Sequence, residues 1–376
     1  MKKAKILAVI LAVLAVTGFF VVRNLTYEAT EGEVVWQKDL SGADSAHPFL
    51  GYEAFSGGVI MYSRDGAEFT DTKGDSVWQR SYQMTEPLCS VCGSYAVIYD
   101  RGGTKLYIFS ETGVTGDVTA AMAVEKAVVS GKGIVYAVLD DKDSEFITAY
   151  RKDGTPIDLS VKSVVNGDGY PFDIAVSPDG SQLITSYVSV SDGKLKESVV
   201  FRNFGEVGQN ADSRRVVGGF IEEFEGHIVT KVTFPTNEYA HAFYDGGVVF
   251  FSTKVLNSPE IIHKVEMEGV MLSVAENSTH TCVVTEEEDG TRKLTVFDAS
   301  GKETGSGAVD LSYTGIVMGE KNILIYNHRN VSGYSFAGRK ILSLTGEGKF
   351  SAVIGASGKR ELYTAEGAVL SKRKIR

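Results

Sequence analysis

Residues 134–158 read IVYAVLDDKDSEFITAYRKDGTPID, and this stretch decides the fold class. An apolar run from Ile134 to Leu139 is followed by a polar turn, a second run from Glu145 to Tyr150, and the turn at Asp153-Gly154. Short runs rich in β-branched and aromatic residues, separated by Asp-Gly turns, predict antiparallel strands joined by hairpins, because glycine accepts the positive φ of tight turns.

The same pattern recurs along the chain at a regular spacing. From Gly66 to Gly367, seven intervals span 301 residues, which is a mean of 43 residues per interval. Four-stranded β-propeller blades repeat at about 40–45 residues. The sequence therefore predicts an all-β propeller. Eight turns mark the repeat: Asp65-Gly66, Gly102-Gly103, Asp143-Ser144, Asp192-Gly193, Asp245-Gly246, Asp289-Gly290, Asn327 to Asn330 and Glu366-Gly367.

Two tryptophan segments predict how the ring closes. Val35-Trp36-Gln37-Lys38 and Val77-Trp78-Gln79-Arg80 are near copies, and the second lies where the outer strand of a blade belongs. The last unit of the chain has only three candidate strands, at 350–355, 360–366 and 368–375. We expect residues 34–40 to supply the missing outer strand, which gives eight blades with no unpaired one. The alternative is a seven-bladed ring with irregular insertions near 185–225.

The N-terminus predicts a membrane anchor. Three lysines in the first five residues precede an uncharged, apolar run from Ile6 to Val22, and Arg23 follows. The run is short for a spanning helix, but large residues occupy the place where a signal peptidase site should lie. We expect residues 1–23 to be a cytoplasmic tail and transmembrane anchor, 24–32 a linker, and 33–376 an extracellular propeller. A cleaved signal peptide is the alternative.

Charge and motifs exclude several functions. The net charge of -10 disfavours nucleic-acid binding. Cys89-x-x-Cys92 lies in a strand-like run without a second ligand pair, which favours buried residues or a disulfide over a metal site. His241 is interpreted as a core or rim histidine, and the acidic stretch from Asp140 to Glu145 as a solvated turn. We expect no catalytic residue, no metal and no cofactor, since no nucleophile elbow, phosphate loop or zinc motif occurs.

Two groups of residues are candidate contact sites. Tyr170, Phe172 and Phe234 lie beside prolines in predicted loops, where aromatic residues either anchor a ligand or pack within blades. Four basic residues end the acidic chain, and they either discourage strand addition at an edge or contact anionic head groups at the membrane surface. These residues are Lys372, Arg373, Lys374 and Arg376.

The strand ending in Ser177-Pro178-Asp179-Gly180, the tryptophan strands and the Asp-Gly spacing resemble WD40-like and quinoprotein-like blades. With the anchor, the whole chain resembles an uncharacterised domain-of-unknown-function family of membrane-anchored propellers from clostridial Gram-positive bacteria. That resemblance implies a fold and no activity. The expectation is a non-catalytic propeller that binds an unknown protein or cell-wall ligand outside the membrane. The alternative is a dispersed-site hydrolase or lyase acting on cell-wall sugars or peptides.

Overall fold

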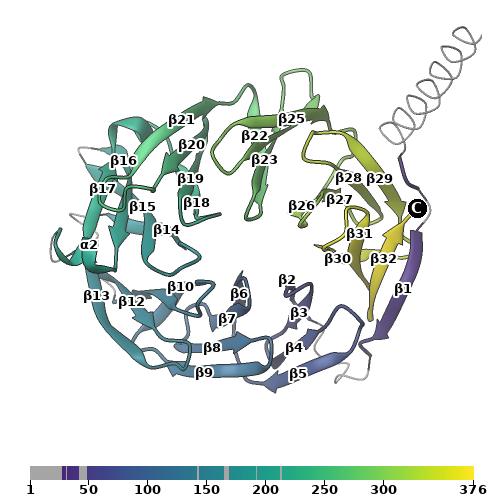
Figure 1. The fold of residues 1–376 in the computed structure, drawn as a ribbon, viewed down its shortest axis with the longest axis horizontal. Helices are drawn as coiled ribbons and strands as arrows, with labels where there is room; N and C mark the ends of the chain where they lie inside the picture. The colour runs from purple at the N-terminus through teal and green to yellow at the C-terminus, as the bar shows by residue number, and fades with distance from the viewer. Residues whose placement is uncertain are drawn as a thin grey trace, which may run out of the picture.

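The computed structural model describes residues 28–30, 32–41, 49–141, 144–164, 169–191, 193–211 and 214–376. Over these residues the chain forms eight four-stranded antiparallel sheets, arranged around one axis as the blades of a propeller (Figure 1). The prediction of eight blades is confirmed, and the seven-bladed alternative is wrong. The long stretch near 185–225 belongs to one enlarged blade.

The first four blades follow one another along the chain, each built from four consecutive strands. Blade 1 contains β2 (Gly51–Phe55), β3 (Gly58–Tyr62), β4 (Gly66–Thr70) and β5 (Ser76–Ser81). Blade 2 contains β6 (Pro87–Cys92), β7 (Tyr95–Asp100), β8 (Lys105–Ser110) and β9 (Gly113–Thr119). Blade 3 contains β10 (Ala123–Val129), β11 (Val135–Asp140), β12 (Ser144–Tyr150) and β13 (Pro156–Val164). Blade 4 contains β14 (Tyr170–Val176), β15 (Gln182–Ser191), β16 (Lys194–Asn203) and β17 (Val216–Phe220), with the short helix α2 (Glu206–Gln209) before β17.

The remaining blades complete the ring. Blade 5 follows the 3-10 turn η1 (Glu222–Phe224) and contains β18 (Val229–Thr233), β19 (Tyr239–Tyr244), β20 (Gly247–Ser252) and β21 (Glu260–Glu266). Blade 6 contains β22 (Val270–Glu276), β23 (His280–Glu286), β24 (Arg292–Asp298) and β25 (Glu303–Ala308). Blade 7 contains β26 (Gly315–Met318), β27 (Ile323–Tyr326), β28 (Asn330–Tyr334) and β29 (Lys340–Thr345). Blade 8 contains β30 (Phe350–Gly355), β31 (Glu361–Glu366), β32 (Val369–Ile375) and β1 (Gly32–Asp39).

Blade 8 joins the two ends of the described chain. β1 pairs antiparallel with β32, from Gly32 opposite Ile375 to Asp39 opposite Val369. This is the pairing that the two tryptophan segments predict. The segment before β1 is also held, because Ala29 forms a parallel bridge to Leu342 of β29. Residues 28–30 of the predicted linker therefore lie against the outer strand of blade 7.

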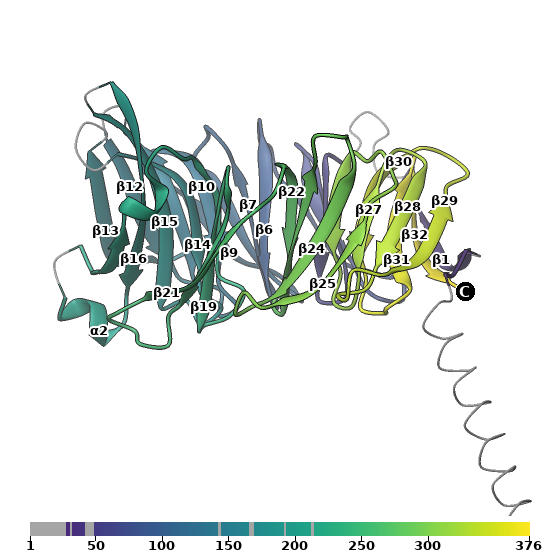
Figure 2. The ribbon, with the colours of Figure 1, turned by 90° about the horizontal axis from the view of Figure 1, so that it is seen from above.

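The ring has two different faces. The turns between the second and third strands, together with the connections between blades, form what we call the upper face. The turns between the first and second strands and between the third and fourth strands form the lower face. Figure 2 shows the ring from the side, with α2 on the lower face. All inner strands run from the upper to the lower face, so their first residues meet around the upper end of the axis.

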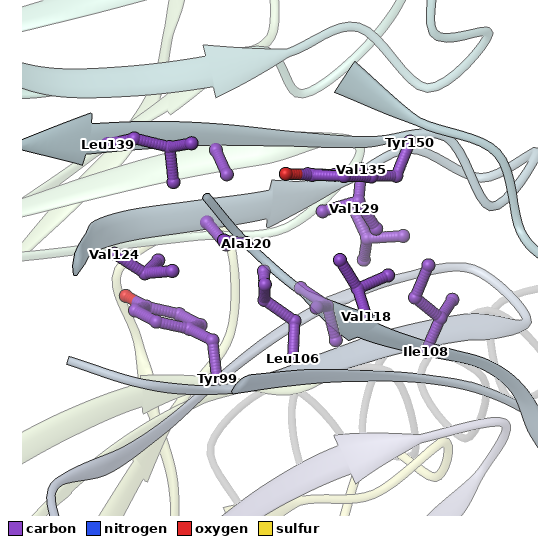
Figure 3. Packing of buried hydrophobic residues seen from close by; sticks show 13 residues of the cluster. Tyr99, Leu106, Ile108, Val118, Ala120, Val124, Val129, Val135, Leu139 and Tyr150 are labelled. Atoms are coloured by element: carbon purple, nitrogen blue, oxygen red, sulfur yellow. The ribbon is translucent and has the colours of Figure 1, made fainter. Parts of the chain in front are cut away.

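The core lies between neighbouring blades. In one cluster, Leu106 and Ile108 of blade 2 pack against Val124, Val135 and Leu139 of blade 3 (Figure 3). Middle strands such as β3, β7 and β20 read as nearly continuous apolar runs because both of their faces contact another blade. The repeated burial between blades makes the ring a rigid frame for its loops.

Among the described residues, no helix is both long enough and apolar enough to span a bilayer. The predicted anchor from Ile6 to Val22 lies outside these residues.

Candidate functional site

A cavity of about 470 Å³ lies at the lower end of the propeller axis. The turns that follow the inner strands of blades 1, 2, 6, 7 and 8 line it, including Phe55, Val91, Asn277, Met318 and Ser357. Most of these groups are small, neutral side chains and exposed backbone. The lining also includes the carboxylate of Glu320, which accepts a hydrogen bond from Ser357 Oγ at 3.0 Å.

Charged side chains on the inner strands lie near the axis. Lys126 of β10 forms an ion pair with Asp173 of β14, which also accepts hydrogen bonds from the backbone N–H of Val232 (2.8 Å) and Ile174 (3.0 Å). Asp173 thus links blades 3, 4 and 5. These contacts pin adjacent inner strands together and are structural.

A second group of charges reaches the axis from blades on opposite sides of the ring. Lys231 of β18 lies 2.9 Å from Glu276 of β22. Burial raises the pKa of Glu53 on β2 to about 7, and the positive charge of Lys231 acts in the opposite direction. Since Lys231 is four blades away from Glu53, the two side chains approach one another across the axis. Glu53 forms no hydrogen bond or ion pair with any residue that the structure describes.

Two further acids have raised pKa values, but at other places. Burial and the nearby Asp140 and Glu125 raise the pKa of Glu145 in blade 3 to about 7. Burial and Asp245 raise that of Glu197 in blade 4 to about 7. The interpretation of residues 140–145 as wholly solvated is wrong for Glu145, which faces blade 4 and is buried. The three raised acids do not meet, and within the described chain no three His, Cys, Asp or Glu side chains could hold a metal ion.

Exposed apolar side chains of blades 4 and 6 lie at the upper end of the axis. Five inner strands carry a one-residue register shift near their upper end, and two of the extra residues are Phe172 of β14 and Leu272 of β22. Bulges redirect a side chain out of the regular alternation. Phe172 is 48% exposed, Leu272 41% and the neighbouring Val270 67%. The upper mouth therefore offers apolar contact area on a rigid frame.

The three aromatic residues predicted as candidate contact sites differ in exposure. Phe172 is exposed and Tyr170 half-buried at the start of β14. Phe234 follows β18 and is only 8% exposed, packed with Phe201 in the core between blades 4 and 5. Phe234 is therefore a core residue, because blade 4 covers its side chain.

The C-terminal basic residues are largely engaged within blade 8. The guanidinium of Arg373 lies 2.7 Å from Glu366, and its Nε donates to Thr364 at 3.1 Å. Lys372 pairs with Glu361 at 3.4 Å and Arg376 with Glu33 at 2.5 Å. Lys374 is exposed. Arg373 is buried, so this residue lies outside any exposed contact surface.

The remaining motif residues are structural. Cys89 packs against the cluster between blades 1 and 2, whereas Cys92 packs against that between blades 2 and 3, so the two sulfurs lie on opposite faces of β6. All three thiols are free. His241 is a core residue, as predicted: its ring nitrogens contact Ala299 O at 2.9 Å and Thr281 Oγ1 at 3.1 Å, and burial lowers its pKa.

A family model matches residues 25–373, nearly the whole chain. The chain belongs to the DUF5711 family, a family of unknown function. No sequence among curated proteins matches this DUF5711 chain.

Solved structures similar to this DUF5711 protein are propellers of distant sequence. BamB from Moraxella catarrhalis has 16% identity and a TM-score of 0.54, and the match covers 92% of this chain and 100% of BamB. Sqt1 from Chaetomium thermophilum, solved bound to the N-terminus of a ribosomal protein, has 11% identity and a TM-score of 0.55, with 88% and 100% covered. AztD from Citrobacter koseri has 10% identity and a TM-score of 0.51, with 80% and 87% covered. At these identities the likeness establishes the fold alone.

Glu53, Lys231 and the apolar pair Val270 and Leu272 were not predicted from the sequence. A signal for the last two was present, because residues 270–272 read Val-Met-Leu without the alternation expected of a strand with one wet face. Nothing local distinguishes Glu53, whose surroundings come from other blades.

Proposed function

We propose that this DUF5711 protein is a non-catalytic binding propeller, tethered to the cell membrane by residues 6–22 with its ring outside the cytoplasm. The observation that carries the binding role is the exposed apolar mouth at Phe172, Val270 and Leu272. Exposed apolar side chains on a rigid scaffold are typical of protein-binding sites, because their desolvation favours association.

The other exposed apolar residues of blade 4 extend this surface. Val190 and Leu195 face one another across the β15–β16 hairpin and are 74% and 39% exposed. Both strands of this hairpin have ten residues, and the hairpin tip lies on the upper face. A partner seated on the mouth would therefore also meet an apolar tip.

Burial of the acidic side chains disfavours the enzyme alternative. Glu145 and Glu197 have raised pKa values but are buried between blades. Glu53 lies near Lys231, whose ammonium group already pairs with Glu276 at 2.9 Å. A glycosidase needs two carboxyl groups flanking one bond; Glu145 and Glu197 are buried in different blades, and the positive charge of Lys231 neutralises the carboxylate of Glu276 near Glu53.

The test is site-specific photo-cross-linking in cells. A photo-reactive amino acid at position 272 on the upper mouth should yield a defined cross-linked protein or polymer, because partners desolvate this surface. Position 256, an equally exposed leucine on the lower face, is the matched control. Val270→Asp should abolish the cross-link at 272 without changing the melting temperature. Equal products at 272 and 256, or none at 272, would refute the binding role.

The tether is tested separately. The full-length protein should remain in the membrane fraction after alkaline extraction and should retain its first residues by N-terminal sequencing. Release into the soluble fraction would refute the tether and leave the binding role standing.

A further inference from the structure

The two faces of the ring carry opposite charge. Between consecutive strands, the described turns of the upper face hold 13 acidic and 4 basic residues, whereas those of the lower face hold 8 acidic and 12 basic residues. The acidic net charge of the chain therefore hides a basic lower face. A charge separation of this kind orients a protein in an external field.

Six lysines of the lower face carry positive charges that no ion pair within the described chain neutralises. Each is exposed, each lies in a turn, and none forms an ion pair with another described residue. The six are Lys73, Lys132, Lys152, Lys302, Lys321 and Lys359.

Four of these lysines surround the point where the chain enters the ring. Lys302, Lys321, Lys359 and Lys73 come from blades 6, 7, 8 and 1 in order around the ring. The entry point lies between blades 7 and 8, where Ala29 N–H donates to Ile341 O at 3.0 Å and Ser343 N–H donates to Ala29 O at 2.8 Å. Glu28 also contacts Lys340, the first residue of β29. The chain therefore runs onto the ring from the lower side.

We propose that this arc of lysines, which we call the lower lysine arc (Lys73, Lys302, Lys321 and Lys359), docks the propeller on the anionic head groups of the membrane. The inference rests on the proposed tether. From Arg23 to Glu28 the chain spans at most about 18 Å when extended, and a screened charge acts over roughly 8 Å at physiological ionic strength. The tether thus holds the arc within reach of the lipid surface.

Docking by the lower face has a consequence for binding. The acidic upper face is repelled by the same surface, so the ring lies with Val270 and Leu272 directed away from the bilayer. Loss of one lysine near an anionic surface weakens attraction by about fivefold. The four lysines together suffice to fix orientation although the whole protein is acidic.

The experiment uses the full-length protein in lipid nanodiscs, with amine acetylation at each lysine measured by mass spectrometry. In phosphatidylglycerol discs at low salt, the arc lysines should label about threefold more slowly than in pure phosphatidylcholine discs, because head groups cover them. High salt should remove this protection. Lys194, Lys196, Lys293 and Lys349, exposed on the upper side without ion pairs, should label equally in both lipids.

Substitution separates docking from the tether. Replacing the four arc lysines by Gln should leave the protein in the discs but lose its orientation, so that Lys132 and Lys152, which remain on the lower face, label equally in both lipids instead of more slowly in anionic discs. The control is the same four Lys→Gln changes at 194, 196, 293 and 349, which should keep the arc protected. Equal acetylation of the arc lysines in both lipids would overturn the proposal. Protection of the arc lysines by a soluble anionic polymer but not by anionic discs would also overturn it. Failure to recover the protein with discs overturns the tether itself.

Discussion

Trp36 of β1 packs against Tyr363 of β31, with ring centroids 5.7 Å apart. Its indole N–H donates to Thr72 O of blade 1 at 2.9 Å. One side chain near the beginning of the described chain therefore contacts both the last blade and the first. Trp78, its near copy, stacks on Phe109 of blade 2 with centroids 4.6 Å apart. Both tryptophans join their own blade to the next one, Trp36 by a hydrogen bond at the closure and Trp78 by ring stacking.

Because Trp36 closes the ring, its removal should lower the free energy of unfolding as much as the removal of Trp78. Trp36→Ala and Trp78→Ala should each cost about 2–3 kcal/mol, below the roughly 3–5 kcal/mol of a fully buried ring, because both are partly buried. Urea unfolding measures this, with Trp36→Phe as the control that retains an aromatic ring. A neutral Trp36→Ala beside a costly Trp78→Ala would contradict a closing role.

The buried Glu197 should make stability depend on pH. Its folded pKa, about 7, lies above that of the unfolded chain, so the folded state binds a proton that the unfolded state releases. Stability from this group is fully present below about pH 4.5 and falls as pH rises through 7. Glu197→Gln should raise stability by about 1–2 kcal/mol at pH 8 and change little at pH 5. Glu287→Gln, in an upper turn, is the control; equal effects at both pH values would refute the account.

Blades 6 and 7 approach too closely for a side chain at Gly305. A Cβ there would lie 2.3 Å from the carbonyl carbon of Ala337, whereas one at Gly219 would meet nothing within 4 Å. Gly305→Ala should therefore cost about 1–3 kcal/mol, and Gly219→Ala should be neutral. Thermal unfolding of both variants measures this difference in stability. Equal melting temperatures for the two variants would refute the close contact at Gly305.

The ion pair between Arg373 and Glu366 should stabilise the folded protein. Their side chains are 10% and 13% exposed, so Arg373→Ala strands a carboxylate and should cost about 3–5 kcal/mol. Lys374→Ala, at an exposed neighbour, should stay within about 0.5 kcal/mol. Chemical denaturation measures both. A stable Arg373→Ala variant with altered lipid binding would instead favour a surface role.

The thiols should be inert in the folded protein. Burial raises the pKa values of Cys89, Cys92 and Cys282, and the thiolate is the reactive form. Iodoacetamide at pH 8 should modify none of them within the time that labels all three in denaturant. Rapid modification of Cys89 in the folded protein would contradict this prediction, because it would show that iodoacetamide reaches the buried thiol.

The sequence by itself was sufficient for the architecture. Apolar runs of blade-like length, Asp-Gly turns at a mean of 43 residues and the repeated Val-Trp-Gln segments predict a propeller of eight units, because hairpin formation and strand burial are encoded within each repeat; the structure excludes the seven-bladed alternative. The surplus outer strand at Trp36 and the deficit in the last unit also imply closure. These properties depend on neighbours close in the chain.

The tertiary structure decided which residues have a use beyond packing. Phe172 and Phe234 look alike in sequence, yet a bulge exposes the first and an adjoining blade covers the second. Lys321 and Arg373 are both basic, but Glu366 engages only Arg373. The pKa of Glu53 depends on Lys231, four blades away. Exposure and charge pairing arise between blades that are distant in the chain, so only the closed ring could reveal them.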